Sequence, residues 1–251
     1  MTAGYTDFEF DLPDALLTHL IRVLDGLQTA PLRPEHLAKL PDAQGVYQLF
    51  LDGELVYIGK TDAEAGLRKR LERHAFKIQH RRNLDPERVS FKAVRIFVFT
   101  AIDLETQLIK HYAGGGTRWN NRGFGANDPA RRRDRTRVKA TNFDAIYPID
   151  LDRELGVDVS DATDAGQVVS RLKQVLPYTF RFELEGGRRP SAELAQTPVN
   201  LSETAPTARA IISAVVAGLP PGWQATAFLH QVILYRETVD DYPDAEILAR
   251  S

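Results

Sequence analysis

The sequence predicts an α+β protein whose central element is a small antiparallel sheet flanked by helices. Segments 46–51 and 55–58 have strand character, and Asp52-Gly53 between them is a favoured two-residue hairpin turn. Apolar residues recur at helical spacing on both sides of this hairpin. After about residue 143 the composition changes, and a second series of helical and strand patterns follows. We therefore expect a helical N-terminal extension over 1–43, a hairpin-containing domain over 44–142, and an α+β C-terminal subdomain of unknown role over 143–251.

The elements around the hairpin have local signals of their own. Helical spacing predicts helices over 12–27, 33–40, 63–79 and 102–112, and imperfect alternation predicts a strand over 89–99. Asp11 is a candidate N-cap of the first helix, with Pro13 near its start. Three consecutive glycines, Gly114 to Gly116, are expected to end the last of these helices.

The C-terminal portion repeats a helix-then-strand order. Helices are predicted over 165–176 and 207–219, strands over 178–184 and 225–237, and a connector rich in Gly, Pro and Ser over 186–206. Segment 113–142 is rich in Gly, Asn and Arg and contains the text RWNNRGFGANDPARRRDRTR, in which aromatic residues are interleaved with cations. A long segment of this kind is usually functional or disordered. We expect a DNA-contacting loop that becomes ordered on its substrate.

Composition excludes several classes of protein. The 251 residues include no cysteine, which excludes disulfides and thiolate metal sites and suits a reducing cytoplasm. The N-terminus is acidic and lacks the pattern of a signal peptide. The longest apolar stretch, Ala210 to Leu219, is too short to span a bilayer as a helix. We expect a cytoplasmic protein without a membrane partner.

The net charge of −2 conceals an uneven distribution. Segment 60–139 holds 20 Lys and Arg against 9 Asp and Glu, a net charge of +11. Segments 1–59 and 140–251 carry net charges of −6 and −7. Charge runs are usually solvated surface, but a basic centre between acidic flanks is also the electrostatic signature of a face that binds a polyanion. We favour nucleic acid, because the basic segment coincides with the motifs described next.

Short motifs occur in one order along this region. Gly45-Val46-Tyr47 precedes the hairpin turn and Tyr57-Ile58-Gly59 follows it; then come Leu67-Arg68-Lys69-Arg70-Leu71, His74, Glu105 and Trp119-Asn120. The series resembles the GIY-YIG nuclease superfamily over residues of roughly 44 to 125, and is closest to its type II restriction endonuclease branch. The resemblance implies the GIY-YIG core fold and hydrolysis of phosphodiester bonds with one divalent metal ion, Mg²⁺ or Mn²⁺.

The resemblance assigns catalytic roles to six residues: Tyr47, Tyr57, Arg70, His74, Glu105 and Asn120. It implies that Glu105 is the metal ligand, and a carboxylate suits Mg²⁺, which keeps most of its waters. Arg70 and His74 are four residues apart and so share one helix face. Arg70 can bind a phosphate oxygen, and His74 can accept a proton near neutral pH. A tyrosine with an ordinary pKa near ~10 is a poor base, so whether Tyr47 or His74 is the general base stays open.

Further residues are expected to contact substrate or support the site. The expected DNA-binding cations are Lys60, Arg68, Arg118, Arg122, Arg131, Arg132, Arg133 and Arg135. Gly45 and Gly59 are expected to let backbone and substrate approach closely. The resemblance implies that Asn120 supports the metal-binding side, and the adjacent Asn121 leaves this assignment uncertain by one position.

Three functions compete at this level. The first is a double-stranded DNA endonuclease in restriction or anti-phage defence, supported by the Arg70/His74 pair and by the GFGANDPARRRD text, which resembles the Gly-Phe-Gly and Asp-Pro segment of those enzymes. The second is a structure-specific or weakly specific nuclease in repair or mobile-element function. The third is a DNA-binding module without catalysis. Expected partners are double-stranded DNA, a second copy in a homodimer, and, for the first function, a cognate methyltransferase or other defence-system protein.

Overall fold

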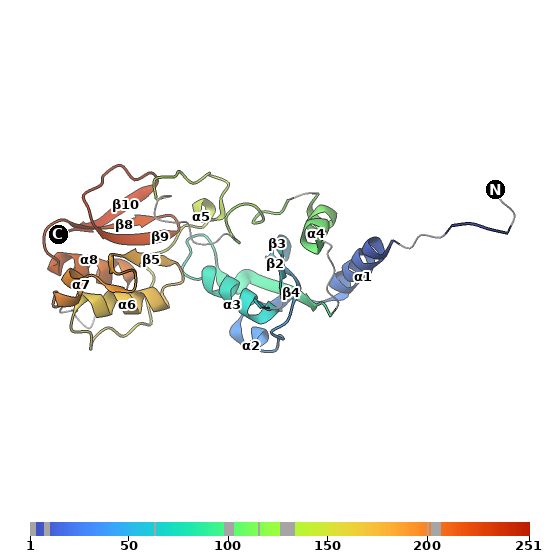
Figure 1. Cartoon of the computed structure of the whole chain (residues 1–251), viewed down its shortest axis with the longest axis horizontal. Coiled ribbons are helices and arrows are strands. Elements are labelled where there is room, and N and C mark those ends of the chain that lie inside the picture. Colours follow the sequence, from blue (N-terminus) through green and yellow to red (C-terminus); the bar gives the residue numbers. More distant parts are fainter. Residues whose placement is uncertain are drawn as a thin grey trace. The chain divides into compact units, whose positions relative to one another are not determined.

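The computed structural model describes residues 4–7, 11–62, 64–97, 103–114, 116–125, 134–199, 201 and 207–251 (Figure 1). The chain divides into two compact units, each of mixed α and β structure. The first comprises Met1–Ala75 and Pro86–Asn121, and the second comprises Phe76–Asp85 and Arg122–Ser251. The chain is therefore α+β, as predicted; the three-part division expected from composition stays a prediction. Within the described ranges, no helix combines the length and apolarity needed to cross a bilayer.

The first unit contains a four-stranded antiparallel sheet. Its strands are β1 (Ala30–Pro31), β2 (Gly45–Leu51), β3 (Glu54–Thr61) and β4 (Val89–Arg95), in the order β1-β4-β2-β3. Asp52 and Gly53 both have positive φ, 54° and 81°, as the tight turn between twisted strands requires. The predicted hairpin is confirmed, and its two strands are longer than the sequence pattern indicated.

Different helices pack on the two faces of this sheet. The helices of the unit are α1 (Leu12–Gly26), α2 (Pro34–Leu37), α3 (Leu67–Lys77) and α4 (Leu104–Ala113), and a 3₁₀ turn, η1 (Pro86–Arg88), precedes β4. Apolar residues of α1 and α4 form one core cluster with Val46 and Ile58. Side chains alternate across a strand, so Tyr47 and Tyr57 lie on the opposite face, where their rings contact His74 of α3.

Local capping explains where the helices begin. The Asp11 side chain accepts a hydrogen bond from the Asp14 amide (2.9 Å), which confirms the predicted N-cap of α1. Helix α3 begins later than the predicted residue 63, because Gly66 adopts a left-handed φ of 63° that interrupts helical geometry.

The second unit is built on a separate four-stranded sheet. Its strands are β5 (Thr179–Phe182), β8 (Trp223–Phe228), β9 (Gln231–Arg236) and β10 (Ala245–Arg250), in the order β10-β8-β9-β5, and only β5 runs parallel to its neighbour. Helices α6 (Ala165–Val175) and α8 (Ala208–Gly218) share one core cluster with this sheet (Figure 1). Shorter elements are α5 (Phe143–Ile146), α7 (Ala192–Gln196) and the ribbon β6 (Leu184–Glu185) and β7 (Arg189–Pro190).

The structure departs from the sequence prediction at three places in this unit. The single strand predicted over 225–237 is the antiparallel pair β8 and β9, which reverses at Leu229 and His230. Neither residue is a turn former, so the reversal has no sequence signal. The predicted connector 186–206 contains β7 and α7. The final strand, β10, was not predicted.

Candidate active site

Two tyrosines from adjacent strands lie on one face of the first sheet. In the register of β2 and β3, Tyr47 is opposite Gly59 and Leu49 is opposite Tyr57. The Tyr47 and Tyr57 ring centroids are 6.0 Å apart. Both tyrosines are buried. The hairpin therefore brings together the two tyrosines of the motif series, as expected.

The motif glycines are required by packing within the protein. A Cβ at Gly59 would lie 2.5 Å from Cζ of Tyr47 and even closer to the Tyr47 hydroxyl oxygen. It would also lie 2.9 Å from Cε1 of Tyr57. A Cβ at Gly45 would lie 2.8 Å from Cδ1 of Leu67 and would collide with the carbonyl of Val94. The expected close approach at these glycines is therefore made by protein atoms, and the tyrosine ring occupies the space that Gly59 leaves.

Helix α3 supplies two polar groups to the same face. The Tyr47 hydroxyl is 2.8 Å from Nε2 of His74, and Nε of Arg70 donates to the Tyr47 hydroxyl oxygen at 3.4 Å. The His74 ring lies 5.5 Å from the Tyr47 ring and 5.4 Å from the Tyr57 ring, measured between centroids. His74 is only 3% exposed, whereas Arg70 is half-buried. His74 is thus part of a buried polar contact and does not lie on the surface.

Burial controls the protonation of both tyrosines. Burial raises the pKa of Tyr47 above its ordinary value, with a smaller upward effect of Tyr57 and an opposing effect of Arg70. Burial also raises the pKa of Tyr57, and the negative charge of Glu105 adds to it. Both hydroxyls are therefore protonated near neutral pH, and a tyrosinate would form only if its proton had an acceptor.

Helix α4 places Glu105 in electrostatic contact with this group. Glu105 is half-buried, and burial raises the pKa of its carboxyl, while the positive charge of Lys60 lowers it in part. Lys60 also forms an ion pair with Asp103 at 2.9 Å. A half-buried carboxylate gains stability from an added cation, so Glu105 fits the role of a single metal ligand. Among the described residues no group of three His, Asp or Glu side chains could hold a metal ion together.

Asn120 holds the end of the first unit against β3. Its Oδ1 accepts from the Ile58 amide (2.9 Å) and from the Thr117 hydroxyl (2.7 Å), and its Nδ2 donates to the Ile58 carbonyl (2.8 Å). Asn120 is buried, whereas Asn121 is exposed with a positive φ of 57°. The geometry gives Asn120 a supporting role for the strand that carries Tyr57.

The predicted DNA-binding cations fall into three groups. In the first unit, three of them pair with carboxylates: Lys60 with Asp103, Arg68 with Asp42 (3.0 Å) and Arg118 with Glu54 (3.2 Å). Arg122 and Arg135 belong to the second unit and are exposed. Arg131, Arg132 and Arg133 lie outside the described residues.

Sequence reasoning missed two supporting residues. Asp103 is the N-cap residue of α4 and pairs with Lys60 across 43 positions of sequence. Thr117 fixes Asn120, since its hydroxyl also accepts from the Asn120 amide at 3.0 Å. An Asp before a helical pattern is a recognisable cap signal, but neither long-range pairing has one.

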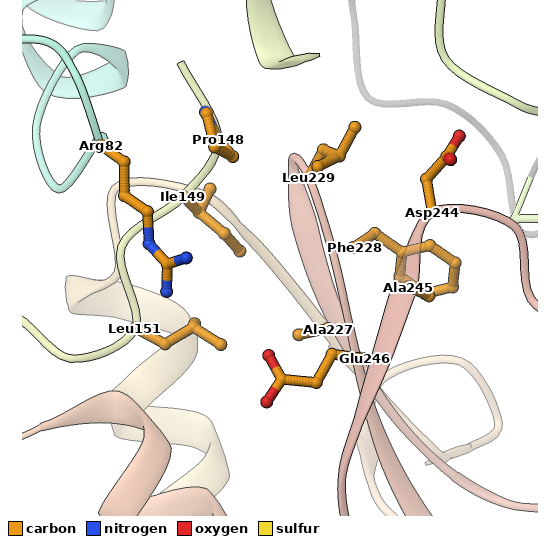
Figure 2. Close-up of a pocket in the computed structure, with 10 residues that line it drawn as sticks. All are labelled: Arg82, Pro148, Ile149, Leu151, Ala227, Phe228, Leu229, Asp244, Ala245 and Glu246. Atoms are coloured by element: carbon orange, nitrogen blue, oxygen red, sulfur yellow. The ribbon is translucent and has the colours of Figure 1, made fainter. Parts of the chain in front are cut away.

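A pocket of about 270 Å³ in the second unit shares no residue with the predicted site. Figure 2 shows Arg82 and Glu246 among the residues that line it, together with Ile149 and Leu151. Arg82 lies 3.4 Å from Asp152, and Glu246 pairs with Arg209 at 2.7 Å. These charges already have protein partners, so we do not assign the chemistry to this pocket.

No match to this chain was found among models of known protein families or among curated proteins.

Proposed function

We propose that this protein is a metal-dependent DNA endonuclease of the GIY-YIG type, which hydrolyses phosphodiester bonds in double-stranded DNA during restriction or anti-phage defence. The observation that carries the proposal is the chain of contacts from Arg70 through the Tyr47 hydroxyl to His74. It combines a cation, a hydroxyl and an imidazole at one place, next to Tyr57 and within electrostatic reach of Glu105. The antiparallel sheet of the first unit, with helices on both faces, is consistent with the core that this family has.

The contact chain suggests how a proton is removed from the attacking water. Arg70 can only donate hydrogen bonds, so the Tyr47 hydroxyl hydrogen is available for Nε2 of His74, which then accepts it. Because the pKa of Tyr47 is raised by burial, we infer that Tyr47 does not act as an isolated base. Tyr47 takes the proton of water while its own proton passes to His74, and Arg70 stabilises the oxygen during the transfer.

Glu105 would hold the metal ion, and the ion when bound would supply positive charge at the phosphate and leaving oxygens. Arg70, half-buried beside Tyr47, would bind a non-bridging phosphate oxygen through its planar fork. Asn120 would keep β3, and therefore Tyr57, in place. Cutting both strands needs two active sites, or one site acting twice. The proposal takes the first route, a homodimer on duplex DNA.

Incubation of the protein with methylated and unmethylated plasmid in Mg²⁺ tests the proposal. A fixed band pattern on unmethylated DNA supports restriction, whereas a smear indicates a weakly specific nuclease and intact plasmid indicates a binding module. Glu105→Gln is the matched control, because it keeps the size of the side chain and removes its charge. The variant should bind DNA and fail to cut it. Cleavage by Glu105→Gln at the wild-type rate would contradict the metal assignment.

A further inference from the structure

A buried carboxylate, Asp134, lies in the most basic part of the chain. Asp134 directly follows Arg131–Arg133 in sequence and directly precedes Arg135. Its side chain is only 4% exposed, while the neighbouring Arg135 is exposed. An ionised carboxylate is costly to bury unless cations or donors compensate for lost water. Burial of the Asp134 carboxylate therefore requires hydrogen-bond donors or cations from the second unit, to which Asp134 belongs.

The partners of Asp134 come from two neighbouring strands. Gln231, the first residue of β9, donates from Nε2 to Oδ1 of Asp134 at 2.7 Å. Arg181 of β5 donates from Nη1 to the same oxygen at 3.4 Å. The Gln231 side chain is itself buried. These contacts connect residues 47 and 97 positions apart in sequence, so they fix the chain at Asp134 to the sheet of the second unit.

The chain before the basic run is also fixed to the second unit. Nζ of Lys77 donates to the carbonyls of Gly123 (3.0 Å) and Phe124 (2.6 Å). The Phe124 ring packs 4.8 Å from the Phe143 ring, and the Phe143 amide donates to the Arg122 carbonyl. Both flanks of the basic run therefore have anchors in the same unit.

From these contacts we propose that the second unit is a platform for DNA binding, in which buried Asp134 is a positioning residue that fixes Arg135 for contact with backbone phosphate. The inference rests on the proposed function and gives the second unit a role in it. Substitution of Asp134 would change DNA binding in two opposite ways, through charge and through positioning. Charge alone predicts that removing Asp134 strengthens DNA binding, because the region becomes more basic. Positioning predicts the opposite, because an exposed cation without a fixed place binds phosphate less well.

The test is binding of Asp134→Asn to a fluorescent duplex, measured by anisotropy without divalent metal over a series of salt concentrations. We expect affinity to fall about tenfold, and the slope of log K against log salt to decrease by about one for each phosphate that the protein no longer neutralises. Asp241→Asn is the matched control, since it removes the same charge from an exposed residue of the same unit. Its affinity should be unchanged or slightly higher. Unchanged or tighter binding by Asp134→Asn would overturn the proposal.

A charge exchange guards against simple loss of folding. The double variant Asp134→Asn/Gln231→Glu keeps one carboxylate and one amide beside Arg181, so it should restore affinity and salt slope. A folded double variant that binds as weakly as Asp134→Asn would overturn the positioning role.

Trypsin provides a readout that needs neither DNA nor activity. Cleavage after Arg135, followed by mass spectrometry, should be faster in Asp134→Asn than in the wild type and slow again in the double variant. Equal cleavage rates would overturn the anchor. Wild-type protein without salt-dependent DNA binding would instead contradict the proposed function and the platform, while the trypsin result would still report on the anchor.

Discussion

Coupling between Tyr47 and His74 is the sharpest test of the candidate site. Tyr47→Phe removes one hydroxyl and keeps the ring that fills the space beside Gly59. His74→Leu removes the imidazole and keeps an apolar side chain at a buried position. The two groups meet at 2.8 Å in a site with almost no solvent. Each single change removes a buried hydrogen-bonding partner, at a cost of about 1–3 kcal/mol in the free energy of unfolding.

The double variant removes both partners together, so no buried group of this pair is left without its partner. Its loss in the free energy of unfolding should therefore be smaller, by about 1–3 kcal/mol, than the sum of the two single losses. For cleavage, loss of a positioned base costs about 10²–10⁴-fold. If Tyr47 and His74 pass one proton between them, either change disables the same step. The double variant should then cleave about as slowly as the slower single variant, and the two losses should not multiply.

Single-turnover cleavage of a supercoiled plasmid, with protein in excess, measures the chemical step for all four proteins. Urea unfolding of the same samples measures the coupling in stability. Multiplication of the two rate losses in the double variant would refute the relay, and wild-type cleavage by Tyr47→Phe would exclude the Tyr47 hydroxyl from the chemistry.

Three further predictions address residues around this pair. Burial raises the pKa of Glu105, so the folded protein holds the proton of this carboxyl more tightly than the unfolded chain does. The free energy of unfolding therefore falls as pH rises from the unfolded pKa through the folded pKa, where the buried carboxyl becomes ionised. Glu105→Gln should consequently be more stable than the wild type at pH 8, with the difference vanishing toward pH 4 in urea unfolding, and Mg²⁺ should stabilise the wild type alone. Asn120→Ala should lower the free energy of unfolding by about 1–3 kcal/mol, since it leaves buried backbone groups of β3 without partners; Asn121→Gly, compatible with the positive φ, is its control in thermal unfolding. Gly59→Ala should cost about 1–3 kcal/mol through overpacking against the tyrosine ring, whereas Gly26→Ala, where an added Cβ meets nothing within 4 Å, should not destabilise in the same assay.

Local signals predicted the hairpin and most helices of the first unit. The turn residues Asp52 and Gly53 have the positive φ values that their types favour, and Asp11 caps its helix as its position indicated. Patterns with a period of 3.6 or two survive folding because one face of each element is buried. The same reasoning failed at Leu229, where β8 turns into β9 without a turn residue, because tertiary packing determines that reversal.

The candidate site was only partly predictable. Sequence spacing placed Arg70 and His74 on one helix face, but it gave no reason to expect that His74 is buried against a tyrosine hydroxyl. The pairing of Asp103 with Lys60 depends on the meeting of α4 and β3, which no local pattern encodes. Charge counting found the basic region, yet it did not show that Arg68 already faces a carboxylate.

The contacts of Gly45 explain why the motif works as one geometrical unit. Gly45 lets Leu67, the first residue of α3, approach β2 closely. The buried face of α3 consists of Leu67, Leu71 and His74, which recur at helical spacing. The packing of Leu67 against β2 therefore determines the distance of this face from the sheet and the rotation of the helix about its axis. A side chain at position 45 would displace α3 and lengthen the contact between His74 and Tyr47. The first glycine of the motif series thus acts on the candidate chemistry through a helix that begins more than twenty residues later.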